Sequence, residues 1–185
     1  MKYFMLIGRT GVGKSSFINT TFGVNAAPIS HYESCTKVVK HYSKSSQWGN
    51  FCLLDTPGLC EDNDVLDDKY LGLIKNDKSI PHNVSVVYVT VLNDTRFRRE
   101  EKMALKKIYD YFPSYFSNMW LIFTFAASVD SARRIEVVTR RRNDIESYIK
   151  SCDRGFKGFT EVAMVDNVVS NWSTSSITPD EFFCG

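Results

Sequence analysis

Apolar and polar positions along the chain follow two different periods. Continuous apolar runs at 2–7, 84–92 and 120–125 are typical of strands that are covered on both faces. Apolar residues at helical spacing predict a helix over 100–111, and a longer helix with a polar face is expected over 132–149. Weaker patterns predict the remaining elements, which are a helix over 14–22, a hairpin made of 36–43 and 51–55, and a strand over 161–165.

This order of elements predicts an α/β fold. Strands alternate with helices, which favours a mostly parallel sheet with helices on both of its faces, in a single domain over 1–185. The hairpin around the turn-rich segment SSQWGN (45–50) is expected to add one antiparallel edge strand. The last residues, TPDEFFCG, leave room for a C-terminal extension beyond Gly185.

Composition narrows the class of protein without naming a function. Apolar residues make up 43% of the chain and charged residues 24%, as in soluble globular proteins. The net charge of +2 predicts no nucleic-acid partner, because such proteins usually carry a strongly basic face. Two local basic runs, RFRREEK (96–102) and the triplet at 140–142, are expected to be solvated helix faces.

Cysteine usage and the absence of long apolar runs bear on the compartment. The five cysteines are an odd number without CxxC spacing, so neither a disulfide framework nor a zinc site is expected. No signal peptide precedes the first strand, and no apolar run approaches the ~20 residues that cross a bilayer. We expect a cytoplasmic protein, with any membrane association at the cytosolic face and through a segment outside this chain.

The segment GRTGVGKSS (8–16) carries the strongest chemical signal. Gly8-x-x-x-x-Gly13-Lys14-Ser15 is a complete P-loop, and it follows a predicted strand and opens a predicted helix, as that motif requires. Glycines allow main-chain N–H groups to surround phosphate oxygens, and the helix adds the positive end of its dipole. The lysine reaches the β- and γ-phosphates, and the serine hydroxyl binds Mg²⁺. The residues expected to bind nucleotide here are Gly8, Arg9, Thr10, Gly11, Val12, Gly13, Lys14, Ser15 and Ser16.

Two further segments fit a nucleotide switch. The motif Asp55-Thr56-Pro57-Gly58 ends a predicted strand, where an aspartate can support Mg²⁺ and the Gly58 N–H can meet the γ-phosphate. By itself such a motif is an ordinary turn, but behind a P-loop the functional interpretation is favoured. Thr36, before the hairpin, can close on Mg²⁺ when the γ-phosphate is present and release it afterwards, as in GTPase switches.

Five segments together resemble a known family. GRTGVGKSSFIN, SCT, LLDTPGL, NDTRFRREEKMAL and LIFT are similar to the AIG-type G domains, the immunity-associated (GIMAP-like) GTPases, which are related to chloroplast outer-envelope import-receptor GTPases and to septins. The similarity extends from about residue 3 to about residue 170. Its most specific part is Arg96-Phe97 followed by Glu100-Glu101, which resembles the family's RF/YT-x-E-E box.

The resemblance implies a set of roles. The chain would bind GTP and GDP with Mg²⁺ and pair as a homodimer through the nucleotide face. Ser15 and Thr36 would ligate Mg²⁺, and Asp55 would support it. The base-reading loop would follow Thr124. A second base contact would come from Asp166 and Asn167.

The base-reading loop departs from the GTPase pattern. Guanine-specific loops read [NT]KxD, whereas this chain has Thr124-Phe125-Ala126-Ala127, with neither the lysine nor the aspartate. Either a longer loop brings Asp130 round, or the base is recognised by backbone groups and by stacking on Phe125 or Trp172. GTP is the expected nucleotide. The sequence supports phosphate binding more strongly than it supports a preference for GTP over ATP.

Catalysis departs from the pattern as well. Leu59 follows DTPG where Ras-like enzymes have a glutamine that orients water, so slow hydrolysis by a monomer is expected. The resemblance suggests that a second copy helps, and Arg96 is the first candidate for an arginine supplied in trans, ahead of 98–99, with Lys14 and Thr36 completing the catalytic set. Arg96 could instead only pair with Glu100, and His31 is a further candidate for orienting water.

Three functions remain open from the sequence. The first is a GTPase switch that hydrolyses slowly alone and faster as a dimer. The second is a GTP-bound assembly or scaffold module with negligible turnover, which Leu59 favours. The third is a P-loop kinase, which DTPG after a hairpin and the lack of an arginine-rich lid disfavour.

Overall fold

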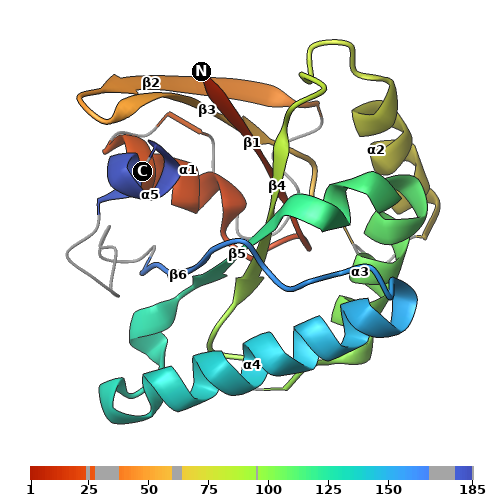
Figure 1. Cartoon of the computed structure of the whole chain (residues 1–185), viewed down its shortest axis with the longest axis vertical. Coiled ribbons are helices and arrows are strands. Elements are labelled where there is room, and N and C mark those ends of the chain that lie inside the picture. Colours follow the sequence, from red (N-terminus) through yellow and green to blue (C-terminus); the bar gives the residue numbers. More distant parts are fainter. Residues whose placement is uncertain (24–25, 28–37, 60–63, 95, 167–177, 185) are drawn as a thin grey trace.

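The protein is described by a computed structural model over residues 1–23, 26–27, 38–59, 64–94, 96–166 and 178–184 (Figure 1). A six-stranded sheet has the order β2-β3-β1-β4-β5-β6, and only β2 runs antiparallel to its neighbour. The strands are β1 (Lys2–Ile7), β2 (Lys40–Ser46), β3 (Gly49–Asp55), β4 (Ser85–Val91), β5 (Met119–Thr124) and β6 (Val162–Met164). The predicted fold class is confirmed.

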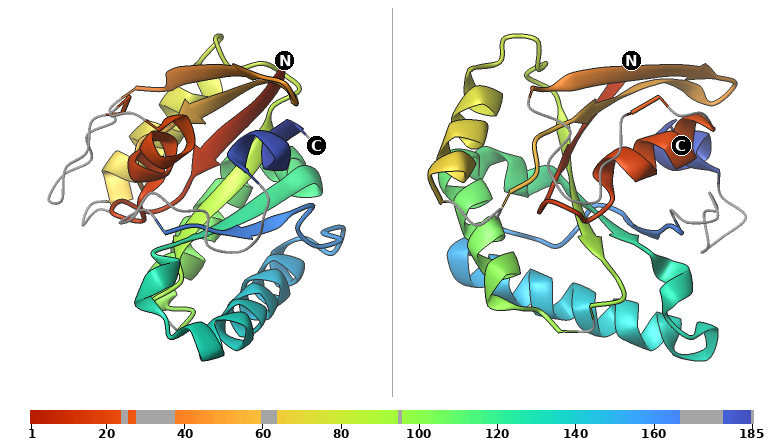
Figure 2. Two further views of the ribbon diagram at one scale, coloured as in Figure 1. Left: turned by 90° about the vertical axis from the view of Figure 1, so that its left-hand side faces the viewer. Right: turned by 180° about the vertical axis from the view of Figure 1, so that it is seen from behind.

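Helices cover both faces of this sheet. The helices α1 and α5 lie on one face, and α2, α3 and α4 cover the other (Figures 1 and 2). The α-helices are α1 (Lys14–Phe22), α2 (Asp64–Asn76), α3 (Arg99–Tyr111), α4 (Ser131–Cys152) and α5 (Pro179–Cys184), and short 3₁₀ turns are η1 (Pro113–Asn118) and η2 (Ala126–Ser128). In the part of the chain that is described, no helix has the length and apolar character needed to span a membrane.

The period of two in the strands divides the core between the two faces. In β1, Phe4 and Leu6 pack with Phe183 on the α1/α5 side, while Met5 and Ile7 join the cluster under α2, α3 and α4. All of these side chains are at most 1% exposed. Because β1, β3, β4 and β5 are parallel, their carboxyl ends lie at one edge of the sheet, and the loops that follow them meet there.

Three elements differ from the sequence prediction. The hairpin strand β2 was predicted over 36–43 but is observed at Lys40–Ser46, with a two-residue connection, because Ser46 pairs with Gly49 and its hydroxyl accepts a hydrogen bond from the Trp48 N–H. The helices α2 and α5 were not predicted. In the part of α2 whose side chains are described, Leu71 and Ile74 are buried, and Phe183 is buried in the short α5.

The expectation of solvated basic runs is wrong at two positions. Arg141, in the triplet at 140–142, is fully buried, and Glu101, in the run at 96–102, is 3% exposed. One Arg141 nitrogen donates to both Glu101 carboxylate oxygens, at 2.8 and 2.9 Å. The charges attract across α3 and α4, and this pairing between distant segments was not readable from local periodicity.

Candidate functional site

The loop between β1 and α1 has the backbone conformation that a phosphate nest requires. Gly11 and Gly13 adopt left-handed φ values of 77° and 87°, which side-chain-bearing residues rarely adopt. Gly8 lies against β4 so closely that an added Cβ would be 2.3 Å from the Val89 carbonyl oxygen. The three glycines therefore allow the loop to turn tightly and to place its N–H groups around a common centre.

Lys14 opens α1 and is 7% exposed. Its ammonium donates to the carbonyl oxygens of Gly8 and Arg9, each at 3.1 Å. These bonds hold the charged group against the inside of the loop, at the N-terminal end of a helix. A helix N-terminus favours negative charge, so the lysine and the helix act on an anion in the same direction.

Ser15 and Asp55 meet at the carboxyl edge of the sheet. The Ser15 hydroxyl donates to the Asp55 carboxylate at 2.9 Å, although the residues are 40 positions apart. Asp55 ends β3 and is fully buried. A hydroxyl and a carboxylate are hard oxygen donors of the kind that Mg²⁺ takes, and Mg²⁺ usually completes its shell with water and substrate phosphates. The described residues contain no group of three or more His, Cys, Asp or Glu side chains that would bind a metal without a substrate.

The DTPG segment is joined to the P-loop through the main chain. The Thr10 N–H donates to the Leu59 carbonyl at 2.9 Å, and the Leu59 N–H donates to the Gly8 carbonyl at 3.1 Å. Gly58 packs on the P-loop so closely that an added Cβ would lie 2.6 Å from the Thr10 Cα. The Thr56 hydroxyl bonds the Leu6 carbonyl at 2.6 Å. The DTPG segment and the P-loop are therefore in direct contact through main-chain hydrogen bonds and close packing.

The loop after β5 is tied to the same unit. The buried Thr124 hydroxyl donates to the Val12 carbonyl at 2.7 Å, so this threonine holds the P-loop to β5. Phe125 follows in a left-handed conformation, with φ of 54°. Asp166 is 2% exposed and directly follows Val165, whose carbonyl accepts from the Ala126 N–H at 3.2 Å. The predicted base-reading segments at 124–127 and 166 therefore lie next to each other.

Asp130 has a structural partner in this loop. It is the N-cap of α4, and its carboxylate accepts from the Ala132 N–H at 2.8 Å. Such a cap contributes ~1 kcal/mol to a helix. The carboxylate is therefore bound to α4, and the sequence hypothesis that Asp130 turns towards a base competes with this bond.

The candidate arginines in the loop between β4 and α3 have different surroundings. Arg98 is bound to Asp94, with its Nε 2.9 Å from one carboxylate oxygen and 3.1 Å from the other. Arg96 is exposed, and the ion pairs among the described residues include none between Arg96 and Glu100. Arg96 thus keeps its guanidinium at the surface, at the same sheet edge as the P-loop. The sequence did not identify Asp94 as the residue that distinguishes the two arginines, although its i,i+4 spacing from Arg98 was a usable signal.

Four residues named from the sequence fall outside the described part of the chain. They are His31, Thr36, Asn167 and Trp172. The predictions attached to them, including the Mg²⁺ ligand at Thr36 and the base contact at Asn167, stay predictions.

Comparisons with known proteins agree on the type of domain. Residues 3–124 match the family described as 50S ribosome-binding GTPase. The chain is 31% identical over 128 residues to "GTP-binding protein A" of Dictyostelium discoideum, covering 68% of this chain and 28% of the relative. It is 32% identical over 111 residues to "Translocase of chloroplast 34" of Pisum sativum, covering 58% of this chain and 34% of the relative. The chain thus spans about a third of the length of these curated relatives.

Solved structures show the same fold at low sequence identity. Toc33 from Arabidopsis thaliana in complex with GDP and Mg²⁺ superimposes with a TM-score of 0.71 at 20% identity, covering 97% of this chain and 74% of that one. A second solved structure has a TM-score of 0.76 to this chain, with the same identity and coverage. It is described by the words "Dimerization is important for the GTPase activity of chloroplast translocon components atToc33 and psToc159". These values support the architecture of the domain.

Proposed function

Since the chain belongs to the family described as 50S ribosome-binding GTPase, we propose that it is a GTP-binding switch of the AIG type. It hydrolyses GTP slowly as a monomer and faster when two copies pair across their nucleotide faces. The proposal treats 1–185 as one G domain, which acts in the cytoplasm or, through a segment outside this chain, at the cytosolic face of a membrane.

One observation carries the proposal. The Ser15 hydroxyl and the Asp55 carboxylate are 2.9 Å apart, directly behind a loop with two left-handed glycines and a buried lysine. Such a combination provides an anion-binding nest, a cation for phosphate oxygens and hard donors for Mg²⁺ in one place. A glycine-rich turn that served only the fold would not require the buried lysine or the serine–aspartate contact.

Each group of the P-loop has a proposed task. N–H groups of residues 8–16 surround the phosphates, and the Lys14 ammonium exchanges its two carbonyl partners for phosphate oxygens, with which charge-assisted bonds are stronger. Thr36 completes the site when the γ-phosphate is present. Asp166 and Asn167, with the loop after Thr124, surround the base.

The residues present fit a magnesium ion. Ser15 and Thr36 would ligate it, and Asp55 would support it through water or directly. When bound, Mg²⁺ offsets the negative charge of the β- and γ-phosphates. The related fold of Toc33, which was solved with GDP and Mg²⁺, supports this assignment.

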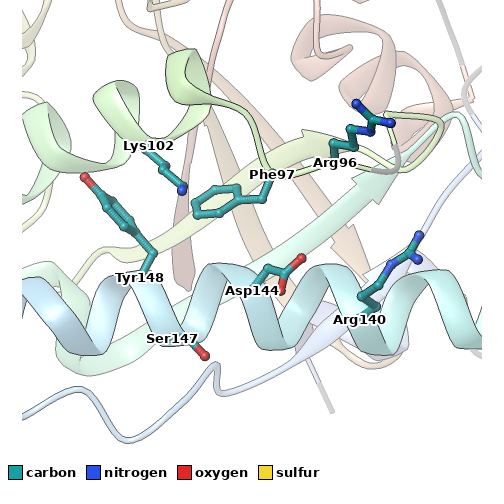
Figure 3. A pocket seen from close by; sticks show the side chains of 7 residues that line it. All are labelled: Arg96, Phe97, Lys102, Arg140, Asp144, Ser147 and Tyr148. Carbon is teal, nitrogen blue, oxygen red and sulfur yellow. The ribbon is translucent and has the colours of Figure 1, made fainter.

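Arg96 is the proposed residue that acts in trans. Arg98 is already bound to Asp94, whereas the Arg96 guanidinium extends from the carboxyl edge of the sheet (Figure 3). An arginine supplied by a second molecule can accelerate hydrolysis by ~10³–10⁵. The statement that dimerization matters for the GTPase activity of atToc33 supports a paired active form.

The test is the dependence of turnover on protein concentration. We expect GTP hydrolysis per molecule to rise with concentration in the micromolar range, and Arg96→Ala to remove this rise while GDP binding is kept. Arg98→Ala is the matched control and should keep most of the rise, because Arg98 is bound to Asp94. Turnover that is flat with concentration in the unaltered protein would contradict the proposal.

One observation favours a second function, a GTP-bound assembly module with negligible turnover. Leu59 occupies the position of the water-orienting glutamine and is fully buried, with its main chain bonded to the P-loop. It cannot orient water. GTP that is retained unhydrolysed after purification would favour this second function, and GDP would favour the switch.

A further inference from the structure

A pocket lies between α3 and α4, beyond the candidate nucleotide site. It has a volume of about 620 Å³ and is lined by the β4–α3 loop and by the facing sides of both helices (Figure 3). Arg96, Phe97 and Lys102 come from the loop and α3, and Arg140, Asp144 and Tyr148 come from α4. None of the roles proposed above, apart from that of Arg96, involves these residues.

The floor of the pocket is aromatic and rigidly supported. The rings of Phe97 and Tyr148 meet edge to face, with centroids 5.6 Å apart. Behind Phe97 lies the buried Arg141, whose guanidinium carbon is 5.8 Å from the ring centre. Arg141 is fixed in turn by its two bonds to Glu101. Phe97 and Tyr148 are only partly buried, so part of each ring remains exposed to a ligand.

The Glu101 carboxylate is also fixed from the sheet side. It accepts from the Thr90 hydroxyl at 2.6 Å and lies 3.4 Å from the Tyr88 hydroxyl, both on β4. Burial, and secondly the nearby Glu101 charge, raise the pKa of Tyr88 well above its ordinary value, so this hydroxyl stays protonated and available as a donor. The pocket floor is therefore connected to the central sheet.

The rim of the pocket has an excess of positive charge. Its lining contains three cations, Arg96, Lys102 and Arg140, and a single carboxylate, that of Asp144. Among the described residues, neither Arg96 nor Arg140 takes part in an ion pair, and Lys102 lies over the Phe97 ring at 5.3 Å. Exposed cations without partners over an aromatic floor favour a ligand with carboxylates and a flat or aliphatic side chain.

We propose that this pocket docks an acidic peptide segment of a partner protein. Carboxylates of the peptide pair with Arg140 and Lys102, and a neighbouring apolar side chain lies on Phe97 and Tyr148. Asp144 disfavours a nucleic-acid backbone, because its carboxylate repels phosphate groups, whereas a peptide also offers N–H groups and basic side chains to it. The net charge of the chain is only +2, whereas proteins that bind nucleic acid usually carry a strongly basic surface.

The test is an NMR titration of the full chain, run both with and without GDP. The probe is a synthetic octapeptide of alternating glutamate and phenylalanine, and its counterpart has glutamine in place of glutamate. We expect saturable shifts of the amide signals of 96–102 and 140–148 with the acidic probe, at a Kd below 1 mM (roughly the range of weak, specific contacts), and at least tenfold weaker binding of the glutamine peptide.

Matched charge reversals locate the binding. Arg140→Glu and Lys102→Glu should each weaken the acidic probe by about tenfold or more, whereas Arg133→Glu, on the exposed first turn of α4 and outside the pocket, should leave its Kd unchanged. All three variants should retain GDP and unfold at the temperature of the unaltered protein. These variants spare Arg96, so the test is independent of the proposed GTPase mechanism.

Several outcomes would overturn the proposal. They are an absence of saturable shifts up to millimolar concentrations of the acidic probe, a loss of probe affinity in Arg133→Glu equal to that in Arg140→Glu, and equal affinities for the acidic and the glutamine peptides. Tighter binding of a single-stranded oligonucleotide of the same charge would assign the pocket to nucleic acid instead. Loss of a dimer in Arg140→Glu, measured by analytical ultracentrifugation without peptide, would assign it to a second copy of the chain.

Discussion

Two buried cations, Lys14 and Arg141, are held in contrasting ways on the two sides of β4. Lys14 is bonded by peptide carbonyls of its own loop, five and six residues away. Arg141 is bonded by the carboxylate of Glu101, which lies 40 residues away on another helix. Carbonyl oxygens carry only partial charge, so they hold an ammonium without neutralising it, whereas a carboxylate neutralises a guanidinium.

The contrast separates a binding group from a structural one. Lys14 can exchange its partners for phosphate oxygens, because a carbonyl of a flexible glycine loop loses little when it is released. Arg141 cannot leave Glu101 without exposing two buried charges to an apolar interior. Under the proposed function, Lys14 exchanges its carbonyl partners when nucleotide binds, whereas the Glu101–Arg141 pair stays in place.

The largest effect is expected at Lys14. Lys14→Ala should lower the affinity for GDP by about 100-fold or more, since each bond from a charged donor contributes ~1.5–3 kcal/mol. The unfolding temperature without nucleotide should change little, because the two carbonyls can bond water at this loop. Fluorescence titration with a labelled GDP measures the affinity, and Lys78→Ala, an exposed lysine after α2, is the control. Unchanged affinity in Lys14→Ala would contradict the phosphate assignment.

For the Glu101–Arg141 ion pair we expect a loss of stability with little change in GDP affinity. Glu101→Leu leaves the Arg141 charge buried without its partner, so the free energy of unfolding in urea should fall by ~3–5 kcal/mol. The double variant Glu101→Leu/Arg141→Met should regain at least half of this loss, the remainder coming from the Thr90 hydroxyl, which loses its acceptor.

The double variant also provides the comparison with Lys14. Its GDP affinity at low temperature, where it is folded, should stay within about threefold of the original, because the pair acts on stability and not on phosphate binding. Losses in the two single variants that simply add in the double variant would show that the two charges are not coupled.

A smaller effect is expected where the two phosphate segments touch. Gly58→Ala places a methyl group 2.2 Å from the Thr10 hydroxyl oxygen, so the P-loop or the DTPG segment must move. We expect a roughly tenfold loss of GDP affinity, because a displaced nest offers fewer aligned N–H groups. Gly72→Ala, within α2, is the matched control: nothing lies within 4 Å of its added Cβ, and it should stabilise the protein by ~0.5–1 kcal/mol without changing affinity. Equal affinities for the two variants would show that the Gly58 contact has no role.

The phosphate end could be predicted because its chemistry is contiguous. Gly13, Lys14 and Ser15 are neighbours in sequence. They lie between an apolar strand and a helix, which is the arrangement that a P-loop requires. Asp55 was named by the same reasoning, at the end of a strand and near Gly58, and the structure places its carboxylate against the Ser15 hydroxyl. The alternation of apolar strands and helices was equally sufficient for the mostly parallel sheet, which the structure confirms.

The α3–α4 side could not be predicted, since its interactions join residues from different segments. A buried Arg141 has the same local pattern as an exposed arginine, and only the approach of Glu101 from α3 distinguishes the two. The helix α2 was not predicted, although its sequence DVLDDKYLGLIKN carries apolar residues at helical spacing, among them the buried Leu71 and Ile74. The predicted base-reading loop lacks the usual residues, and the structure shows the Thr124 hydroxyl bonded to the P-loop carbonyl of Val12, a contact that no spacing in the sequence indicates.

Nucleotide binding at the P-loop is tested by calorimetric titration of nucleotide-free protein with GTP, GDP and ATP, with and without Mg²⁺. We expect one saturable site per chain, strengthened by Mg²⁺, with GTP preferred to ATP. Absence of binding heat for all three nucleotides, together with failure of any of them to raise the unfolding temperature, would contradict this expectation.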